Sequence, residues 1–472
     1  MIHDYIQAGF PSPPLEYAQN YYVHYPKVAF GHWPPVYFVL QAAWTLLFGP
    51  SLVSVLILQC VVAALLFTLS HLLLRRWFEP WIAAPACLLV LTSAIVAQLS
   101  RTLGSELLLS FLVLATLLLV ERFLQTPSPA LAAATSALAL AAVLTKGTAL
   151  MLAPLTLIMV TAYGGWRILR LRFVWGSLAL LAAVAVPWYF LVPGALHERV
   201  HRFGGLGWFS GPLRMKATLS FWPALFGWLG LALIFAGLLA LLFSSRYRHL
   251  LPFGFVALAA PIVMLFFRLT VRVWEVRHLV ACLPFLLFFL CLGFTELARV
   301  LGAGRAARTA VVVLAAAGAF LHVRAMPAKP RLGLDDVAVY LAAAGEPERP
   351  LLVVSDAVGE GALIAEMALH DERPAHRIDR GNKVFITANL MATDVRRNYS
   401  SQADLLRMLA ALPHRAVVVD EAPHAAAFLA EVRLALSDPA SGWRLERVFP
   451  RLSPAGEHRR ILIWTRAPAA SR

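Results

Sequence analysis

The chain has 472 residues, of which 60% are hydrophobic and only 14% are charged. Soluble domains carry about 25% charged residues, so this composition excludes a compact soluble enzyme, a disordered tail and a disulfide scaffold. The charge is also uneven: residues 1–325 hold 22 Lys and Arg against 8 Asp and Glu, whereas residues 326–472 hold 19 against 18. The first part is therefore predicted to be an integral membrane protein, and the last part a separate soluble domain.

The distribution of basic residues and cysteines limits the partners that we expect. The excess positive charge lies in short loops between apolar runs, as membrane orientation requires, so no nucleic-acid partner is predicted. The four cysteines lie inside apolar segments and are interpreted as small core residues. Because acids are scarce in the membrane loops, we predict no dedicated metal site and no other cofactor, although one or two carboxylates could hold a divalent cation together with waters.

Residues 1–50 are expected to form an outer-face loop with amphipathic and interfacial helices. Ile2–Ala8 has an amphipathic pattern that includes Asp4, and Val36–Phe48 is an apolar run of about 13 residues, too short for a span. Residues 1–10 resemble neither a signal peptide nor a signal anchor. We therefore expect that either an upstream helix is missing from this reading frame or the first span inserts unaided.

Residues 51–325 contain runs long enough to cross about 30 Å of hydrocarbon. We place about ten spans, at 52–73, 81–99, 105–121, 129–145, 147–163, 173–192, 219–243, 252–267, 278–298 and 309–323. Arginines gather in the short loops of one side, which is predicted to be cytoplasmic. The fold class is thus an α-helical polytopic membrane protein of the plasma (inner) membrane, with its C-terminal domain on the extracytoplasmic side.

The last third begins with a linker, predicted over residues 326–349 and rich in proline near its start. Residues 350–472 are predicted to form a soluble α/β domain. Buried strands are expected at 350–356, 415–420 and 461–465, and helices at 361–370 and 425–436. Strands that alternate with helices favour a largely parallel sheet. Asp356 and Asp420 lie at the C-terminal ends of two of these strands, where they either line a crevice or cap the next helix.

Ionisable groups in a membrane domain are costly, so its eight acids form a short list of candidates for chemistry. Glu79, Glu121 and Glu296 are interpreted as solvated loop charges beside arginines. Glu106 stands at the outer mouth of an apolar helix. It is either a helix N-terminal charge beside a Ser105 cap or a carboxylate that faces an outer cavity and acts on a hydroxyl or holds a cation.

Three basic residues on the outer side are candidates for binding a lipid phosphate. Lys146 lies between two apolar runs, where it either snorkels to the interface or grips a phosphate. Arg272 and Arg277 precede a span together with Glu275. Glu275 and Arg277 either pair with each other or leave the arginines free to form a phosphate clamp.

Several motifs in order give a resemblance to a known family. The segment Tyr25-Pro-Lys27-Val-Ala-Phe-Gly31-His32-Trp33-Pro34-Pro35-Val-Tyr37 resembles the first outer loop of GT-C glycosyltransferases, in the branch of protein O-mannosyltransferases and lipid A aminoarabinose transferases. Ser105-Glu106-Leu, Leu144-Thr-Lys146-Gly147 and Arg277-His278-Leu-Val-Ala-Cys-Leu283-Pro284 follow in the expected order, so the resemblance covers residues 15–300.

The resemblance implies a GT-C fold and an enzyme that moves a sugar from a polyprenyl-phosphate carrier to a lipid, glycan or protein acceptor on the outer face. Such chemistry needs cations for the departing phosphate, for which Lys146, Arg272 and Arg277 are the candidates, and a general base, for which Glu106 is the candidate. Lys27, His32, Tyr37 and Glu275 are expected to line the substrate cavity.

The family's acidic motif in the first outer loop, commonly Asp-Glu, has no counterpart in this sequence, and we do not assign its role to Asp4. A chain truncated at the N-terminus would lack both the first helix and this motif, so an inactive or truncated GT-C-like protein is one alternative. A membrane transporter is another, although no clear inverted repeat is seen. A sensor or assembly scaffold that presents the α/β domain is the third.

Overall fold

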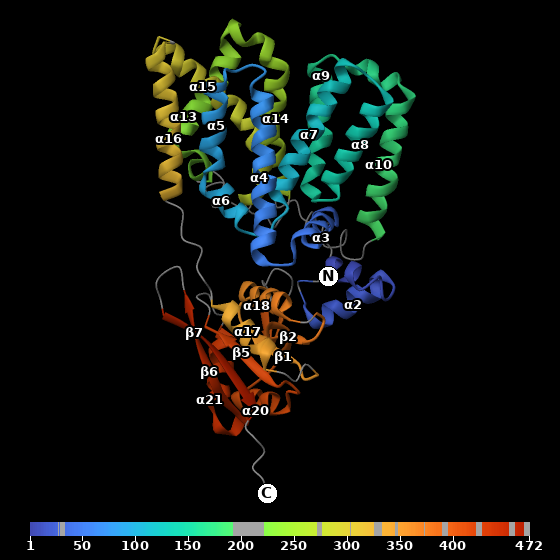
Figure 1. The fold of residues 1–472 in the computed structure, drawn as a ribbon, viewed down its shortest axis with the longest axis vertical. Helices are drawn as coiled ribbons and strands as arrows, with labels where there is room; N and C mark the ends of the chain where they lie inside the picture. The colour runs from blue at the N-terminus through green and yellow to red at the C-terminus, as the bar shows by residue number, and fades with distance from the viewer. Residues whose placement is uncertain are drawn as a thin grey trace. The chain divides into compact units, whose positions relative to one another are not determined.

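The computed structural model describes the chain except for residues 27, 29–33, 192–220, 271–275, 303, 325–332, 345–347, 372, 389–394, 422–426, 453–457 and 467–472. The chain divides into two compact units. One consists of residues 32–326, and the other combines residues 1–31 with residues 327–472. Figure 1 shows the first unit as a set of helices and the second as helices around a sheet.

Apolar helices build the unit of residues 32–326 (Figure 1). The described α-helices are α3 (Val36–Phe48), α4 (Leu52–Leu74), α5 (Pro80–Leu91), α6 (Ala94–Ser100), α7 (Glu106–Gln125), α8 (Pro129–Val143), α9 (Leu152–Ala162), α10 (Arg172–Leu191), α13 (Phe221–Phe243), α14 (Leu251–Thr270), α15 (Leu283–Val300) and α16 (Arg305–Arg324). Short 3-10 helices join some of them: η1 (Gly147–Met151), η2 (Trp166–Arg170), η3 (Ser245–Leu250) and η4 (Val276–Cys282).

The ten predicted spans all coincide with helices. Within the described residues, seven helical segments are long and apolar enough to cross a membrane, and α5 with α6 forms an eighth that is bent by 64°. The two other predicted spans correspond to α8 and to η1 with α9, which are shorter apolar helices. The short run Val36–Phe48 is a helix with the predicted bounds. The chain is thus a multi-pass membrane protein.

Helix α15 is the most enclosed of these candidate spans. Every residue from Leu283 to Phe294 is buried. Helix α13 approaches it closely because each helix has a glycine at the crossing. A Cβ on Gly237 would lie 2.1 Å from the Phe289 carbonyl oxygen, and one on Gly293 would lie 2.0 Å from the Leu233 carbonyl oxygen. Small residues of this kind allow membrane helices to pack backbone to backbone.

Helix α7 carries a buried carboxylate at each end and packs against α4, α8, α9 and η4. At its C-terminal end, Glu121 accepts hydrogen bonds from Arg76 at 2.7 Å and from Tyr163 at 3.2 Å. Glu121 was predicted to be a solvated loop charge, and this was wrong because the neighbouring helices cover its side chain. Partners from the turns that follow α4 and α9 satisfy the charge that burial would otherwise leave exposed to hydrocarbon.

A five-stranded sheet forms the centre of the second unit (Figure 1). The strands lie in the order β2-β1-β5-β7-β6, with a separate pair β3-β4. Their bounds are β1 (Leu351–Val354), β2 (Ile378–Arg380), β3 (Ile386–Ala388), β4 (Val395–Arg397), β5 (Ala416–Asp420), β6 (Trp443–Leu452) and β7 (His458–Arg466). The described helices are α1 (Ile2–Gln7), α2 (Pro14–His24), α17 (Leu334–Ala343), α18 (Ala357–His370), α19 (Gly381–Val384), α20 (Gln402–Ala411) and α21 (Ala427–Ser437).

Both faces of the sheet are covered, and each face contributes to a separate core. Leu351 and Val353 face a core with α2, α17 and α18, whereas Leu352 and Val354 face a core with α20 and α21. The three predicted strands correspond to β1, β5 and β7, and the two predicted helices correspond to α18 and α21. The sheet is parallel only across β2, β1 and β5, because β7 pairs antiparallel with both β5 and β6.

Two sequence-based boundaries differ from the structure. The predicted linker over residues 326–349 contains α17, whose apolar face belongs to the core of the second unit. Residues 1–31 were grouped with a loop of residues 1–50, whereas the structure joins them to residues 327–472.

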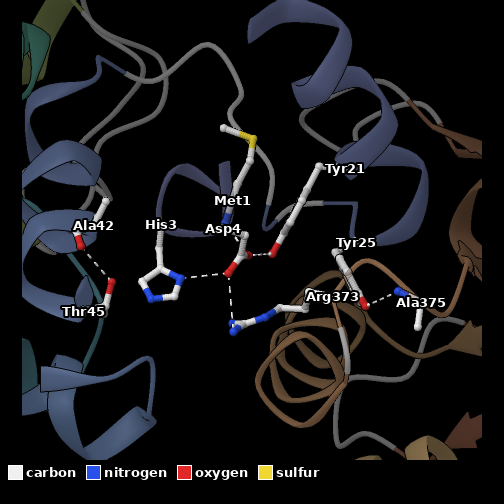
Figure 2. A network of polar contacts seen from close by, with 9 residues as sticks. All are labelled: Met1, His3, Asp4, Tyr21, Tyr25, Ala42, Thr45, Arg373 and Ala375. Carbon is white, nitrogen blue, oxygen red and sulfur yellow. Dashed lines mark hydrogen bonds and ion pairs between the residues drawn. The ribbon is translucent and has the colours of Figure 1, made fainter. Parts of the chain in front are cut away.

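The junction between the two ends of the chain includes the network of polar contacts in Figure 2 as well as the apolar core. Asp4 in α1 accepts hydrogen bonds from Tyr21 at 2.9 Å and from His3 at 2.8 Å, and Arg373 lies 3.4 Å away. Tyr25 donates to the carboxylate of Asp371 and accepts from the backbone N–H of Ala375 at 3.2 Å.

Candidate functional site

Three of the predicted site residues meet in one buried cluster of the membrane unit. Lys146 Nζ lies 2.6 Å from Glu106 Oε1, and Arg277 Nε lies 3.1 Å from the same oxygen. Glu106 is 4% exposed and Lys146 is 7% exposed, whereas the side chain of Arg277 is 42% exposed. One carboxylate oxygen thus holds two cations, and the arginine extends from the cluster toward its surface.

Glu106 enters the cluster because it is the first residue of α7. The predicted Ser105 cap is not formed, since the Ser105 side chain makes no capping hydrogen bond. The preceding Gly104 leaves space for the carboxylate: a Cβ there would lie 2.5 Å from Glu106 Oε2. Oε2 is buried and accepts no hydrogen bond from the described residues.

Lys146 enters the cluster from the turn between α8 and η1. The last carbonyl groups of a helix lack partners within it, so other groups must satisfy them. Here the Tyr189 hydroxyl of α10 donates to the Val143 carbonyl at 2.8 Å, and the Val36 N–H of α3 donates to the Leu144 carbonyl at 3.0 Å. These bonds from two other helices fix the turn that directs Lys146 to Glu106.

Arg277 comes from η4, which packs against α7. The next residue, His278, interacts electrostatically with all three members of the cluster. Tyr37, predicted to line the substrate cavity, is buried near the start of α3 and interacts electrostatically with Glu106. Gln59 Nε2 of α4 donates a hydrogen bond to the Tyr37 hydroxyl.

The remaining predicted site residues, Lys27, His32, Arg272 and Glu275, lie outside the described residues. Sequence reasoning missed Gln59 and Gly104. Gln59 in the predominantly apolar α4 was a usable signal, because polar side chains inside membrane helices usually have a specific partner. The sequence gives no such signal for Gly104, because its role is to leave space for the Glu106 carboxylate, and that depends on the conformation of the Glu106 side chain.

A cavity of about 420 Å³ lies between α7, α8, α9 and α10. Its lining is mostly apolar and includes Ala149 and Leu150 of η1, a few residues after Lys146. Among the described residues, no three His, Cys, Asp or Glu side chains gather in a way that could hold a metal ion. In the second unit, Asp356 accepts a hydrogen bond from the Gly359 N–H at 2.6 Å, so it caps α18.

The chain has similarities to known proteins in sequence and in fold. Residues 32–190 match the family described as dolichyl-phosphate-mannose-protein mannosyltransferase, which covers about a third of the chain. No curated protein matches the sequence. The predicted resemblance to GT-C glycosyltransferases is confirmed by this family domain and by the fold of the solved structures below.

Three solved structures share the fold at low sequence identity. ArnT from Cupriavidus metallidurans bound to undecaprenyl phosphate is 18% identical, with a TM-score of 0.59 over 93% of this chain and 89% of that chain. Archaeoglobus fulgidus AglB, in complex with an inhibitory peptide and a dolichol-phosphate, is 13% identical, with a TM-score of 0.54 over 93% and 67%. The Archaeoglobus fulgidus oligosaccharyltransferase tethered to an acceptor peptide is 14% identical, with a TM-score of 0.52 over 93% and 66%.

Proposed function

We propose that this GT-C protein is a glycosyltransferase that moves a sugar from a polyprenyl-phosphate carrier to an acceptor on the outer face of the membrane. The observation that carries the proposal is the buried cluster in which Lys146 and Arg277 meet at Glu106. Buried charges in a membrane unit are costly and usually functional. The family domain and the carrier lipids bound to the structural neighbours support the same chemistry.

In this proposal, the two cations stabilise the leaving group. The bond between the anomeric carbon and the phosphate oxygen breaks, and its electron pair leaves with the phosphate. The acceptor oxygen or nitrogen forms the new bond to the anomeric carbon and gives up its proton to a base. Negative charge therefore grows on the phosphate, where Lys146 and Arg277 donate charge-assisted hydrogen bonds to it.

We assign the apolar cavity between α7, α8, α9 and α10 to part of the polyprenyl tail. Ala149 and Leu150, which follow Lys146 closely in the chain, line one part of it, and the α7 residues of its lining begin further along that helix at Thr116. Burial of each CH₂ group contributes about 0.8 kcal/mol, so a groove of this kind adds substantially to the affinity for the lipid.

The acceptor is a lipid, glycan or protein. We propose that the basic loops face the cytoplasm and that the second unit lies on the extracytoplasmic side of the plasma (inner) membrane. There it would engage the acceptor.

The test is sugar transfer by the purified full chain in lipid nanodiscs, with radiolabelled polyprenyl-phosphate sugars and candidate acceptors. Lys146→Gln and Arg277→Gln are each expected to lower kcat/KM by about 10²-fold, the usual cost of removing one donor to a developing anion. Arg76→Gln breaks the ion pair with Glu121 at the other end of α7 and is the matched control. Absence of transfer by intact wild-type protein would contradict the proposal, as would equal losses in all three variants.

A further inference from the structure

We propose that Tyr189 of α10 is a positioning residue for Lys146: its hydroxyl holds the end of α8 in the conformation that presents the lysine to the carrier phosphate. This inference rests on the proposed function, in which Lys146 binds that phosphate. It assigns part of the phosphate site to α10, a helix that contributes none of the three charged residues of the cluster.

The first carbonyl groups at the end of α8 are satisfied within the turn itself. The Thr145 hydroxyl donates to the Ala141 carbonyl at 2.7 Å. The Lys146 N–H donates to the Ala142 carbonyl at 3.1 Å. These local bonds continue the helical winding up to the lysine, but they reach no other helix.

The next two carbonyl groups are reached from other helices. The Tyr189 hydroxyl donates to the Val143 carbonyl at 2.8 Å. The Val36 N–H of α3 donates to the Leu144 carbonyl at 3.0 Å. Because the donor of α3 is a backbone group, it places no demand on the Val36 side chain. Tyr189, in contrast, makes its bond through the side chain, so the residue type at this position of α10 matters to the turn.

The lysine depends on this turn because its own side chain is flexible. A lysine has a four-carbon stem and a compact ammonium group, which do not fix a direction in the way that a planar guanidinium does. The backbone before Lys146 and the carboxylate of Glu106, 2.6 Å from Nζ, must therefore hold the ammonium group in place. A misplacement of about 1 Å at such a site can lower the rate by as much as about 10²-fold.

The contact between α8 and α10 also borders the apolar cavity that we assign to part of the polyprenyl tail. Val143, whose carbonyl accepts the Tyr189 hydrogen bond, lines this cavity, as do Leu178 and Leu181 of α10. One pair of helices thus contributes both to the surface for the tail and to the bond that fixes the Lys146 turn. Tyr189 thereby links the part of the site that holds the tail with the part that holds the phosphate.

The experiment is a double-mutant cycle on the binding of undecaprenyl phosphate to the full chain in nanodiscs of neutral lipid. Tyr189→Phe removes the hydroxyl and keeps the ring. It is expected to lower the affinity about tenfold, the usual effect of leaving one buried hydrogen-bonding group without its partner. In the Lys146→Gln background the same substitution should change the affinity by less than about twofold, because the effects of a residue and of the group it positions are not additive.

The matched control is Tyr163→Phe, which removes the hydroxyl that donates to Glu121 at 3.2 Å, at the opposite end of α7. It should leave the affinity unchanged, whereas the melting temperatures of the two Tyr→Phe variants should be similar. A hydroxyl that only stabilised the fold would lower the affinity equally in both Lys146 backgrounds.

Two results would overturn the inference and leave the proposed function standing: an unchanged affinity in Tyr189→Phe, or a loss that is the same with and without the lysine. If wild-type protein does not bind undecaprenyl phosphate, the proposed function itself fails, and the inference fails with it.

Discussion

At the scale of single residues, the two buried carboxylates of α7, Glu106 and Glu121, differ in how their charges are satisfied. Glu121 is held by Arg76 and Tyr163, which connect the C-terminal end of α7 to the turns after α4 and α9. Glu106 is held by two cations on one oxygen, while its second oxygen has no hydrogen-bond partner among the described residues. A buried polar atom without a partner costs free energy, and such costs are usually tolerated at functional sites.

The space beside Glu106 gives a prediction. Gly104→Ala places a Cβ 2.5 Å from Glu106 Oε2, so the carboxylate must shift from the position in which it contacts Lys146 and Arg277. We expect affinity for a polyprenyl phosphodiester to fall several-fold and stability to fall by about 1–3 kcal/mol, as in other overpacked sites. Lipid binding and thermal unfolding in detergent measure both. Gly176→Ala in α10 has no atom within 4 Å of its new Cβ and serves as the control. Equal behaviour of the two variants would refute the crowding argument.

At the scale of elements, close helix packing depends on the glycine pair between α13 and α15. Gly293→Ala would bring a Cβ to 2.0 Å from a backbone carbonyl, which cannot rotate away as a side chain could. We expect the helices to separate, with a loss of about 3 kcal/mol in the free energy of unfolding. The melting temperature of the purified protein checks this, again beside Gly176→Ala. An unchanged melting temperature would show that the two backbones are not in contact.

The secondary-structure elements also show how much of the fold could be predicted from the sequence. Helices at the ten predicted positions were predictable because long apolar runs have few other solutions. Among the described residues, seven of these segments, or eight with the bent pair of α5 and α6, are long and apolar enough to be spans. Strand β6 was missed because Pro450 and several arginines hide its pattern, which is tolerated because β6 is an edge strand. Antiparallel pairing of β7 could not be predicted, since a strand's composition does not specify the direction of its neighbour.

The residues of the candidate site could be selected from the sequence, but their arrangement in space could not. Glu106, Lys146 and Arg277 each stood out as charges beside apolar runs, because such charges are rare. Their common meeting point depends on contacts between α7, η1 and η4, which are far apart in the chain. The sequence alone left Glu106 as a base, a cation ligand or a helix-end charge, whereas the geometry favours a counter-ion for two cations.

At the scale of the whole molecule, the second unit is assembled from both ends of the chain. Tyr21 and Tyr25 are fully buried in its core, and Tyr25 donates to Asp371. Burial would raise the pKa of Asp371, but hydrogen bonds from His376 and Tyr25 outweigh it and lower that pKa to about 2. The ionised carboxylate of Asp371 is therefore the form that binds Tyr25 and so connects the two parts of the second unit.

A pH dependence follows from this. Because the folded-state pKa of Asp371 lies below the unfolded value of about 3.9, its stabilisation is complete above pH 5 and is lost as the pH falls toward 2. We expect Asp371→Asn to cost about 2 kcal/mol at pH 7 and about half as much at pH 3. Urea unfolding of this unit in the full chain, followed at both pH values, measures the difference. A cost that does not change with pH would contradict the shifted pKa.

The assembly of the second unit from both parts of the chain also affects the order in which the protein folds during synthesis. Tyr25 and Asp371 are 346 residues apart, so the ribosome must add hundreds of residues before these partners can meet. At about 5–20 residues per second, the N-terminal helices wait roughly 20–70 seconds while the spans are inserted. During that interval Tyr21 and Tyr25 lack the core that later covers them. The second unit can therefore complete its core only after the spans that separate its two parts have been synthesised.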